Sequence, residues 1–342
     1  MKRVCCCVHR AIRLTEIWRD DAAGERRAAL VEGGKIVEIH IQRDLHWVLG
    51  ESGAGRIDRK TPSGCYIATD DGAQLLVRSK AGMEGARVAF EITREAIAEP
   101  GRAKPAEARW LDMLPPHKPD KSTLWNNRIM ALNADAVISR PLSDAFDCAL
   151  VGASDVGDVT VSFQRTKAGL VFDVDGVGDP LAINFAAAKE IARLLRLYQV
   201  GGMVMIDFIS VESREHRKAV AEAFDEQAAL DPRPFERSAI NGYGLMQVVR
   251  ARPRPSVLDH LFGTRIAAVS DETQGLWLLR DIAQSSGFGK RVVTARATVA
   301  ALLSSPKWQP LRAECERVTG APMEIVADEN LTGYGHVHVA QS

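Results

Sequence analysis

Three aspartates follow apolar strands in the middle of the chain and could together bind a metal ion. Asp173 and Asp175 lie in "LVFDVDGVGDP", and Asp207 closes the apolar segment "MVMID". The two-residue period of a β-strand places Asp173 and Asp175 on one face. Carboxylates held close together repel, raise each other's pKa or share a cation, and oxygen ligands suit Mg²⁺ or Mn²⁺. These residues therefore predict a divalent-metal site.

The elements around these aspartates predict one βαβ-like unit. "VTVSFQ" and "GLVFDVDG" are expected strands, a helix capped by Asn184 ends near Val200, and "MVMIDFI" is expected to be a short, fully buried strand. The carboxyl ends of such strands lie side by side, where open α/β sheets place their sites. Two other interpretations stay open. Asp207 could cap the next element or pair with an arginine, and "DGVGDP" could simply begin a turn.

The rest of the chain predicts several smaller modules. Residues 26–43 read as a hairpin around a Glu-Gly-Gly turn, and four short strands in residues 55–94 suit a small barrel. "AEPGRAKPAEAR" is expected to be a linker that ends the barrel. Farther along, "TLWNNRIMAL" predicts a helix, whereas "ADAVISR" and "DCALVG" predict strands. A helix over 213–229 and a strand in "GYGLMQVVRAR" follow, and residues 260–342 alternate helix and strand.

Composition excludes some classes of function and leaves others open. The 342 residues are 46% apolar and 26% charged with a formal net charge of zero, so a polyanion would have to meet a local basic patch. No apolar run approaches the roughly 20 residues of a membrane span, and no signal peptide is evident. A cytoplasmic location follows as the expectation. Cys5, Cys6, Cys7 and His9 could suggest a metal, but free thiols at a frayed terminus are the preferred interpretation.

The central segments together resemble the catalytic core of the ribonuclease E/G family. The resemblance lies in "FDVDGVG", "NFAAAKEIARLLRLYQVGGMVMIDFI" and "EHRKAVAEAF", and it runs from Thr166 to about Arg252, including "INGYGLMQVVRARPRPSV". It implies a DNase I-like catalytic subdomain in which Asp173 and Asp207 hold a magnesium ion, with manganese as a possible substitute. Asp175 stands where the family has an asparagine, which adds a negative charge beside the metal.

The resemblance also implies a domain order. An RNase H-like subdomain (residues 21–50 and 105–157) is interrupted by an OB-fold RNA-binding barrel (51–100), and a DNase I-like catalytic subdomain (158–258) follows. Residues 1–20 are expected to be poorly ordered, and 259–342 to form a small α/β accessory region. The cysteine motif of the family's zinc-link is absent, so zinc-bridged dimers are not expected, while other oligomers stay open. The segment after the barrel is too short for the family's pocket that senses a 5′-monophosphate.

The implied activity is metal-dependent endoribonuclease cleavage of single-stranded RNA, in ribosomal RNA processing or RNA decay. It leaves a 5′-phosphate and a 3′-hydroxyl, and Asp175 would orient ligands or water. Two alternatives stay open: an RNA-binding protein whose cleavage has lapsed, and a phosphoesterase acting on another substrate.

Basic and aromatic side chains are candidates for RNA contact. For each cation the alternative is a solvated helix face or strand edge, and for the tyrosine it is a core strand position. The candidates for phosphate binding and base stacking are Arg217, Lys218, Arg250, Arg252 and Tyr66.

Overall fold

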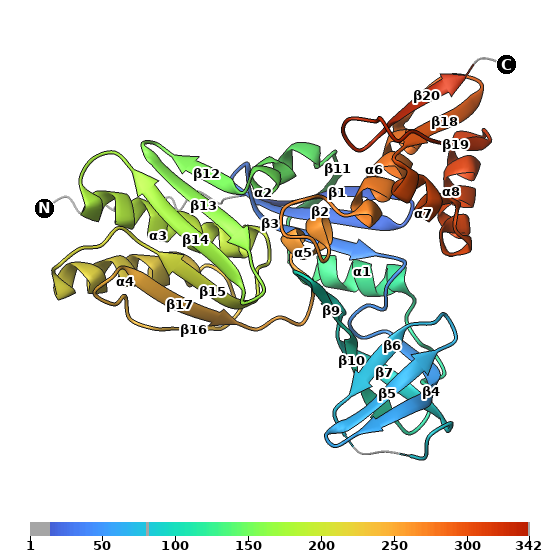
Figure 1. The fold of residues 1–342 in the computed structure, drawn as a ribbon, viewed down its shortest axis with the longest axis horizontal. Helices are drawn as coiled ribbons and strands as arrows, with labels where there is room; N and C mark the ends of the chain where they lie inside the picture. The colour runs from blue at the N-terminus through green and yellow to red at the C-terminus, as the bar shows by residue number, and fades with distance from the viewer. Residues whose placement is uncertain (1–13, 80–81, 341–342) are drawn as a thin grey trace, which may run out of the picture.

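The computed structural model describes residues 14–79 and 82–340 as sheets of four, six, three and two strands and a closed barrel (Figure 1). The mixed α/β class expected from the sequence is therefore confirmed. Within those residues no helix is long and apolar enough to cross a membrane. Cys5, Cys6, Cys7 and His9 lie outside the described residues, so their interpretation stays a prediction.

The four-stranded sheet has the order β11-β1-β2-β3, with β11 parallel to β1 and the other neighbours antiparallel. Its strands are β1 (Thr15–Ala22), β2 (Glu25–Glu32), β3 (Lys35–Arg43) and β11 (Ala136–Ser139), and helix α1 (Lys121–Met130) packs on it. The hairpin and the helix match the sequence pattern. The disordered start expected to residue 20 is wrong from Thr15 onward, because β1 pairs with the whole of β2 and buries Ile17.

The barrel has the order β10-β6-β5-β4-β7 and confirms the small barrel expected from the sequence. Its strands are β4 (Ser52–Thr61), β5 (Gly64–Thr69), β6 (Gln74–Val77), β7 (Arg87–Arg94) and β10 (Ala106–Leu111). The expected linker is wrong. It holds the hairpin of β8 (Ile97–Glu99) and β9 (Arg102–Lys104), and then β10, which closes the barrel by pairing with both β6 and β7. Ala106 and Ala108 alternate into the barrel core, so the barrel extends past residue 100 to Leu111.

The six-stranded sheet has the order β12-β13-β14-β15-β17-β16 and contains the predicted β14-α3-β15 crossover, with β14 and β15 parallel. Its strands are β12 (Ala153–Val156), β13 (Val159–Arg165), β14 (Leu170–Gly176), β15 (Gly202–Asp207), β16 (Phe235–Arg237) and β17 (Leu245–Arg250). Helices α3 (Pro180–Leu197) and α4 (Arg214–Ala228) bury one face of the sheet in the main core. The opposite face is lined by exposed or half-exposed side chains and is called the open face below.

Two local expectations fail for identifiable reasons. Helix α3 begins at Asp179, whose carboxylate accepts hydrogen bonds from the Leu181 and Ala182 N–H groups, so Asn184 is not its cap. "DCALVG" forms helix α2 (Asp147–Val151) instead of a strand, after the short helix η1 (Ser143–Phe146). The buried side chains there, Phe146 and Ala149, are three residues apart, which is a helical spacing.

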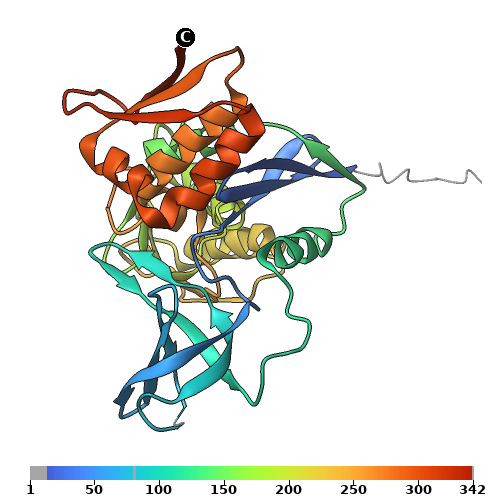
Figure 2. The same cartoon turned by 90° about the vertical axis from the view of Figure 1, so that its right-hand side faces the viewer.

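The C-terminal region folds around its own core of apolar side chains. Helix α5 (Val257–Phe262) still packs into the main core, and the elements that follow it are α6 (Asp271–Gln284), β18 (Lys290–Ala295), α7 (Ala297–Ser304), η2 (Pro306–Trp308), α8 (Gln309–Thr319), β19 (Met323–Ala327) and β20 (His336–Ala340). Figure 2 shows this layer and the barrel at opposite ends of the molecule. Arg280 joins the layer to the first sheet, because its guanidinium bonds the backbone carbonyl and the carboxylate of Asp20. The boundary expected at residue 259 falls inside α5.

Candidate metal and RNA-binding site

Asp173 and Asp207 lie directly beside each other on the open face. They are Cα partners in the parallel pairing of β14 with β15, and adjacent strands lie about 4.8 Å apart. Both side chains are exposed, while Phe172, Val174 and Ile206 between and beside them are buried against the helices. The structure thus brings together the two carboxylates that the strand pattern placed on neighbouring strand ends.

Strand β15 exposes one face, which corrects the expectation that it is fully buried. Val204 and Ile206 are completely buried, whereas Met203 keeps 40% of its surface exposed and Asp207 points the same way. The alternation is the two-residue period of a sheet with one open side. Asp207 therefore ends an apolar strand without paying the desolvation cost of a buried carboxylate.

A buried asparagine fixes the chain immediately after Asp207. The Asn184 side-chain amide donates to the Ile209 carbonyl at 2.7 Å, and its Oδ1 accepts from the Ile209 N–H at 3.0 Å. Asn184 is only 1% exposed, so both bonds form away from water. Sequence reasoning treated this residue as a helix cap. The signal it missed was an amide within an otherwise apolar helix face.

A second contact ties the same loop to the turn that precedes β17. The Phe208 N–H donates to the Gly244 carbonyl at 3.1 Å, and the Ser210 hydroxyl donates to the Tyr243 carbonyl at 3.1 Å. Gly244 has φ +91°, and a Cβ there would lie 2.1 Å from the Phe208 carbonyl oxygen. Only glycine allows this close approach. The strand end bearing Asp207 is therefore held from two sides.

The donor set at this edge fits a hard divalent cation. Neither the Asp173 nor the Asp207 carboxylate is hydrogen-bonded or ion-paired to another residue in the described part of the chain, so two like charges face each other without a protein counter-ion. Over those same residues, no group of three or more His, Cys, Asp or Glu is arranged to hold a metal. The pair offers two oxygen ligands, as suits Mg²⁺, which keeps several waters and takes further ligands from substrate phosphate.

Asp175 lies on the same face of β14, two residues after Asp173. Its strand neighbour on β13 is Thr160, whereas Asp173 lies opposite Ser162. The Asp175 carboxylate accepts a 2.7 Å hydrogen bond from the adjacent Gly176 N–H. Residues two apart on a strand are about 7 Å apart. Asp175 thus lies near the pair but outside it, where an orienting role stays a prediction.

The sequence predicts Arg250 and Arg252 as RNA contacts of this site, but the structure does not place them beside the aspartates. Strand β17 runs antiparallel to β15, so Leu245 lies opposite Asp207 and Arg250 lies opposite Gly202, at the far end of the strand. Arg250 is 5% exposed and bonds the Leu195 carbonyl and the Asp231 carboxylate. It is a buried structural group and not an RNA ligand of this site. Strand direction, which local sequence does not encode, explains the error.

The basic residues at the start of helix α4 follow the Asp207 strand end along the chain but differ in their contacts. Arg217 donates from Nη1 to the carbonyls of Val211 and Glu212 at 2.8 and 2.7 Å, which holds the loop between Asp207 and the helix. Lys218 is 77% exposed and lies 3.4 Å from Glu222. Such exposed pairs contribute little, so Lys218 is available to another anion. Its role in RNA binding stays a prediction.

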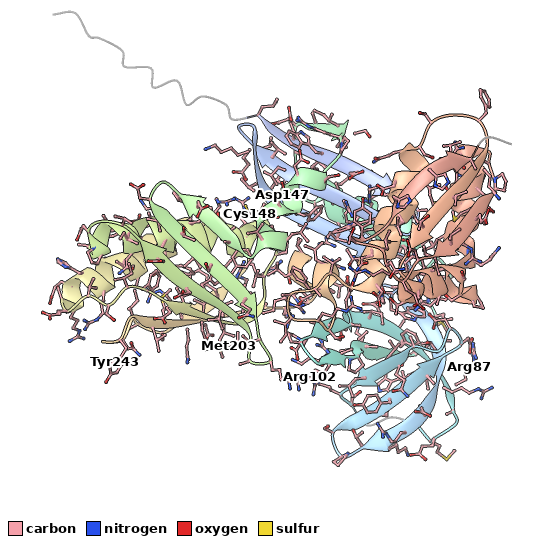
Figure 3. The ribbon with its side chains drawn as sticks, turned by 45° about the horizontal axis from the view of Figure 1, so that its top comes forward. Arg87, Arg102, Asp147, Cys148, Met203 and Tyr243 are labelled. Carbon is pink, nitrogen blue, oxygen red and sulfur yellow. The ribbon has the colours of Figure 1, made fainter. Side chains whose placement is uncertain are left out.

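One half-buried and one exposed aromatic side chain bear on RNA stacking. Tyr66 points outward from the barrel between the buried Cys65 and Ile67, and the Arg59 guanidinium lies 4.9 Å from its ring centre. Its core-residue interpretation is therefore wrong. Tyr243 was missed by sequence reasoning. It is 82% exposed in the turn just before Leu245, the neighbour of Asp207, and projects from the molecule (Figure 3). An aromatic residue between two glycines, "GYG", was the available signal.

An open sheet face with two carboxylates in register offers oxygen ligands of the kind that Mg²⁺ takes in proteins, at the strand ends where open α/β sheets place ligands. A model of the ribonuclease E/G family matches residues 175–253, which include α3, β15, α4 and β17. Over this segment the chain is similar to the ribonuclease E/G family. Asp207 lies inside the match and Asp173 lies two residues before it.

Relatives from plants and bacteria share the same segment. The chain is 36% identical over 77 residues to the chloroplastic ribonuclease E/G-like protein of Arabidopsis thaliana, which is 22% of this chain and 8% of that protein. It is 39% identical over 74 residues to ribonuclease E of Escherichia coli K12, covering 22% and 7%. With ribonuclease G of Salmonella typhimurium the identity is 36% over 77 residues, covering 22% and 15%. The similarity is therefore confined to a small part of these relatives' length.

Proposed function

We propose that this protein is a magnesium-dependent endoribonuclease that cleaves single-stranded RNA. The observation that carries the proposal is the in-register pair of unpartnered carboxylates, Asp173 and Asp207, on the open face of the sheet. The family segment that includes Asp207 supplies independent support, since the matched relatives are ribonucleases. In this proposal the six-stranded sheet is the DNase I-like catalytic subdomain, the barrel is an OB-fold and the four-stranded sheet is RNase H-like.

The chain's own residues have separate tasks in this reaction. Asp173 and Asp207 would hold Mg²⁺, or Mn²⁺ in its place, and the bound ion would activate a water and stabilise charge on the phosphate. Asn184 and Gly244 keep the Asp207 strand end in place through Ile209 and Phe208. Water adds to the phosphorus and the bond to the 3′-oxygen breaks. The products are a 5′-phosphate and a 3′-hydroxyl.

The RNA strand would reach the aspartates along exposed surfaces. The open face is not covered by any helix of the described chain, so an extended strand can approach Asp173 and Asp207 directly. Tyr243 supplies an aromatic face at that edge, and Tyr66 with Arg59 supplies another on the barrel. Stacking on aromatic rings tolerates any base, which suits single-stranded RNA.

The test is cleavage of a fluorescent single-stranded RNA with and without Mg²⁺ by the full chain and by Asp207→Asn. We expect internal cleavage that requires the metal and falls at least about a hundredfold in the variant, because the ion loses a ligand. Asp112→Asn, an exposed aspartate between β10 and α1, is the matched control and should cleave normally. Metal-independent cleavage, or equal loss in both variants, would contradict the proposal.

One observation favours a second candidate, an RNA-binding protein of the family that has lost cleavage. Asp175 adds a third negative charge to the face that carries the metal-binding pair, where the family resemblance implies a neutral asparagine. The same assay separates the two. RNA binding without cleavage at any magnesium or manganese concentration would favour the binding protein, and cleavage restored by Asp175→Asn would identify the responsible residue.

A further inference from the structure

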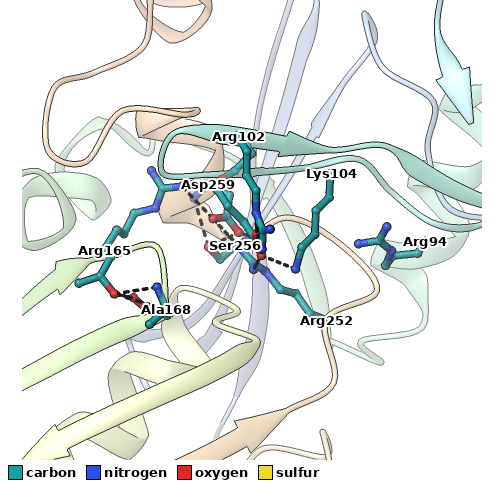
Figure 4. Close-up of polar contacts among 12 residues, drawn as sticks. Arg94, Arg102, Lys104, Arg165, Ala168, Arg252, Ser256 and Asp259 are labelled. Atoms are coloured by element: carbon teal, nitrogen blue, oxygen red, sulfur yellow. Dashed lines mark hydrogen bonds and ion pairs between the residues drawn. The ribbon is translucent and has the colours of Figure 1, made fainter. Parts of the chain in front are cut away.

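A basic pocket lies at the end of the open face opposite the aspartates. Its volume is about 300 Å³, and it is enclosed by the β8–β9 hairpin, the β13–β14 turn, the start of β15 and the first turn of α5 (Figure 4). Gly169 makes the turn possible, because a Cβ there would lie 2.2 Å from the Met203 carbonyl oxygen. These four segments are far apart in sequence and meet only in the folded chain.

The charge of the pocket is strongly unbalanced. The acidic side chains that line it are Glu99 and Asp259. The basic side chains that line it are Arg94, Arg102, Lys104, Arg165, Lys167 and Arg252. In a chain whose formal net charge is zero, this is a local basic site of the kind that attracts a polyanion.

Part of this charge is used inside the protein. Asp259 is buried and pairs with Arg252 at 2.8 Å and with Arg165 at 3.2 Å. Burial raises the pKa of Asp259, but Arg252 and Arg165 outweigh it and leave that pKa below its ordinary value. Arg165 also donates to the carbonyls of Ala98 and Gly263. Arg165 and Arg252 therefore form a fixed floor, held mainly by one carboxylate.

The remaining cations are only partly neutralised, and Arg94 pairs with Glu107 at 3.1 Å. Glu99 alone faces Arg102, Lys104 and Arg252, at 2.7, 2.6 and 3.0 Å. Lys167 is exposed and has no acidic partner within 4 Å in the described part of the chain. The Nε atoms of Arg94 and Arg252 are buried without a hydrogen-bond acceptor among the described residues. A buried donor without an acceptor costs free energy that a bound anion would recover.

The pocket reaches the strand that ends at the proposed catalytic edge. Met203 lines the pocket and projects from β15 on the open face, four residues before Asp207 on the same strand. Four residues of strand span about 13 Å, a distance of a few nucleotides along an extended nucleic-acid chain. Figure 3 shows Met203 beside Arg102 at the junction of the sheet and the hairpin.

We infer that this pocket binds a backbone phosphate of the RNA substrate, a few nucleotides from the bond that is cleaved. The inference rests on the proposed function and names the contact that holds the strand across the open face. The chemistry is that of a phosphodiester met by guanidinium and ammonium groups. The pocket opens toward Met203 and the open face. It therefore fits an RNA chain that passes through the pocket better than an RNA chain whose end is held in it.

The test is binding of the full chain to fluorescent single-stranded RNA in EDTA, so that no cleavage intervenes, at several salt concentrations. The double variant Arg102→Ala with Lys167→Ala removes two exposed cations and spares the floor. We expect roughly tenfold weaker binding and a salt slope reduced by about 0.7 for each phosphate that the variant no longer neutralises. Lys167→Glu should weaken binding further.

The matched control is Arg317→Ala with Lys35→Ala, which removes the same residue types from exposed positions elsewhere. Arg317 pairs with a glutamate three residues earlier, as Arg102 does. RNA with a 5′-hydroxyl and RNA with a 5′-phosphate should lose equal affinity in the test variant. A loss confined to the 5′-phosphorylated RNA would overturn the backbone assignment in favour of a terminal phosphate.

Failure of the inference differs from failure of the proposed function. If the unmodified chain binds RNA and the double variant binds equally well with the same salt slope, only the pocket assignment is overturned. If the unmodified chain binds no RNA at any salt concentration, the proposed function and the pocket assignment both fall.

Discussion

The two ends of one open sheet face carry opposite charge and are built in different ways. At one end, Asp173 and Asp207 stand on neighbouring parallel strands joined by a single helix. At the other, basic side chains from four distant segments surround Asp259 and Glu99. The acidic end is local in sequence and exposed, while the basic end is non-local and partly buried. A metal-binding end and a phosphate-binding end on one surface would orient an RNA strand between them.

The largest effect should come from removing the acidic end altogether. Asp173→Ala with Asp207→Ala deletes both proposed ligands of one ion. The cleavage rate of the double variant should therefore be no lower than that of either single variant. Each should lose at least about a hundredfold in rate. Quantitative cleavage assays at saturating Mg²⁺ measure this. Losses that multiply would show that the two carboxylates act independently and would break their assignment to one site.

A buried arginine should affect stability where a pocket arginine affects binding. Arg250→Ala leaves Asp231 unpaired next to the core, which costs about 3–5 kcal/mol of unfolding free energy. Urea unfolding checks the loss. Arg102→Ala removes an exposed group and should change stability by less than about 0.5 kcal/mol. A salt-dependent loss of RNA affinity in a folded Arg250→Ala protein would restore the RNA-contact role that the structure contradicts.

Lowering the pH should reduce the unfolding free energy through the buried Asp259 at the basic end. The pKa of this carboxyl is below its ordinary value, so the unfolded chain takes up the proton first as pH falls. Its contribution to stability is therefore fully present above the unfolded pKa of about 3.9 and is lost as pH falls below it. Unfolding free energies measured from pH 6 to pH 3 should show the loss. In Asp259→Asn the corresponding part of the pH dependence should be missing, and an unchanged pH profile would sink the assignment.

Asn184 supports the acidic end by holding the backbone at Ile209, and it does not touch the reacting atoms. Asn184→Ala leaves the Ile209 N–H and carbonyl without their hydrogen-bond partner and should lower the unfolding free energy by about 1–3 kcal/mol. Cleavage should also need more Mg²⁺ to reach half its maximum, since the Asp207 strand end is less well held. A magnesium titration of activity checks that shift. Loss of stability with an unchanged magnesium requirement would leave Asn184 a folding residue only.

The smallest expected effect concerns base stacking beside the aspartates. Tyr243→Ala should weaken RNA binding by roughly fivefold, the effect of removing one modest stacking interaction, while Tyr243→Phe retains it. Fluorescence anisotropy in EDTA measures both. Because Tyr243 is 82% exposed, the substitution should leave stability unchanged. Equal loss in the alanine and phenylalanine variants would point to the hydroxyl and away from stacking.

Local sequence predicted the acidic end because its information is local. The alternation in "LVFDVDG" and "MVMID", with a helix between them, is enough to place Asp173 beside Asp207. The same reasoning failed for Arg250, because proximity to the site depended on the direction of β17. It failed for "AEPGRAKPAEAR", where proline and glycine concealed the barrel-closing strand β10.

The amino-acid sequence by itself determined which residues form the strands and helices of the central unit and which carboxylates end its strands. Periodicity and capping depend on neighbours within a few residues, so they can be read along the chain. Only the tertiary structure decided that Arg250 is buried, that Asn184 holds Ile209, and that a basic pocket forms around Asp259. Those contacts join residues tens to more than a hundred positions apart. Strand order, strand direction and loop packing, which no local pattern specifies, bring them together.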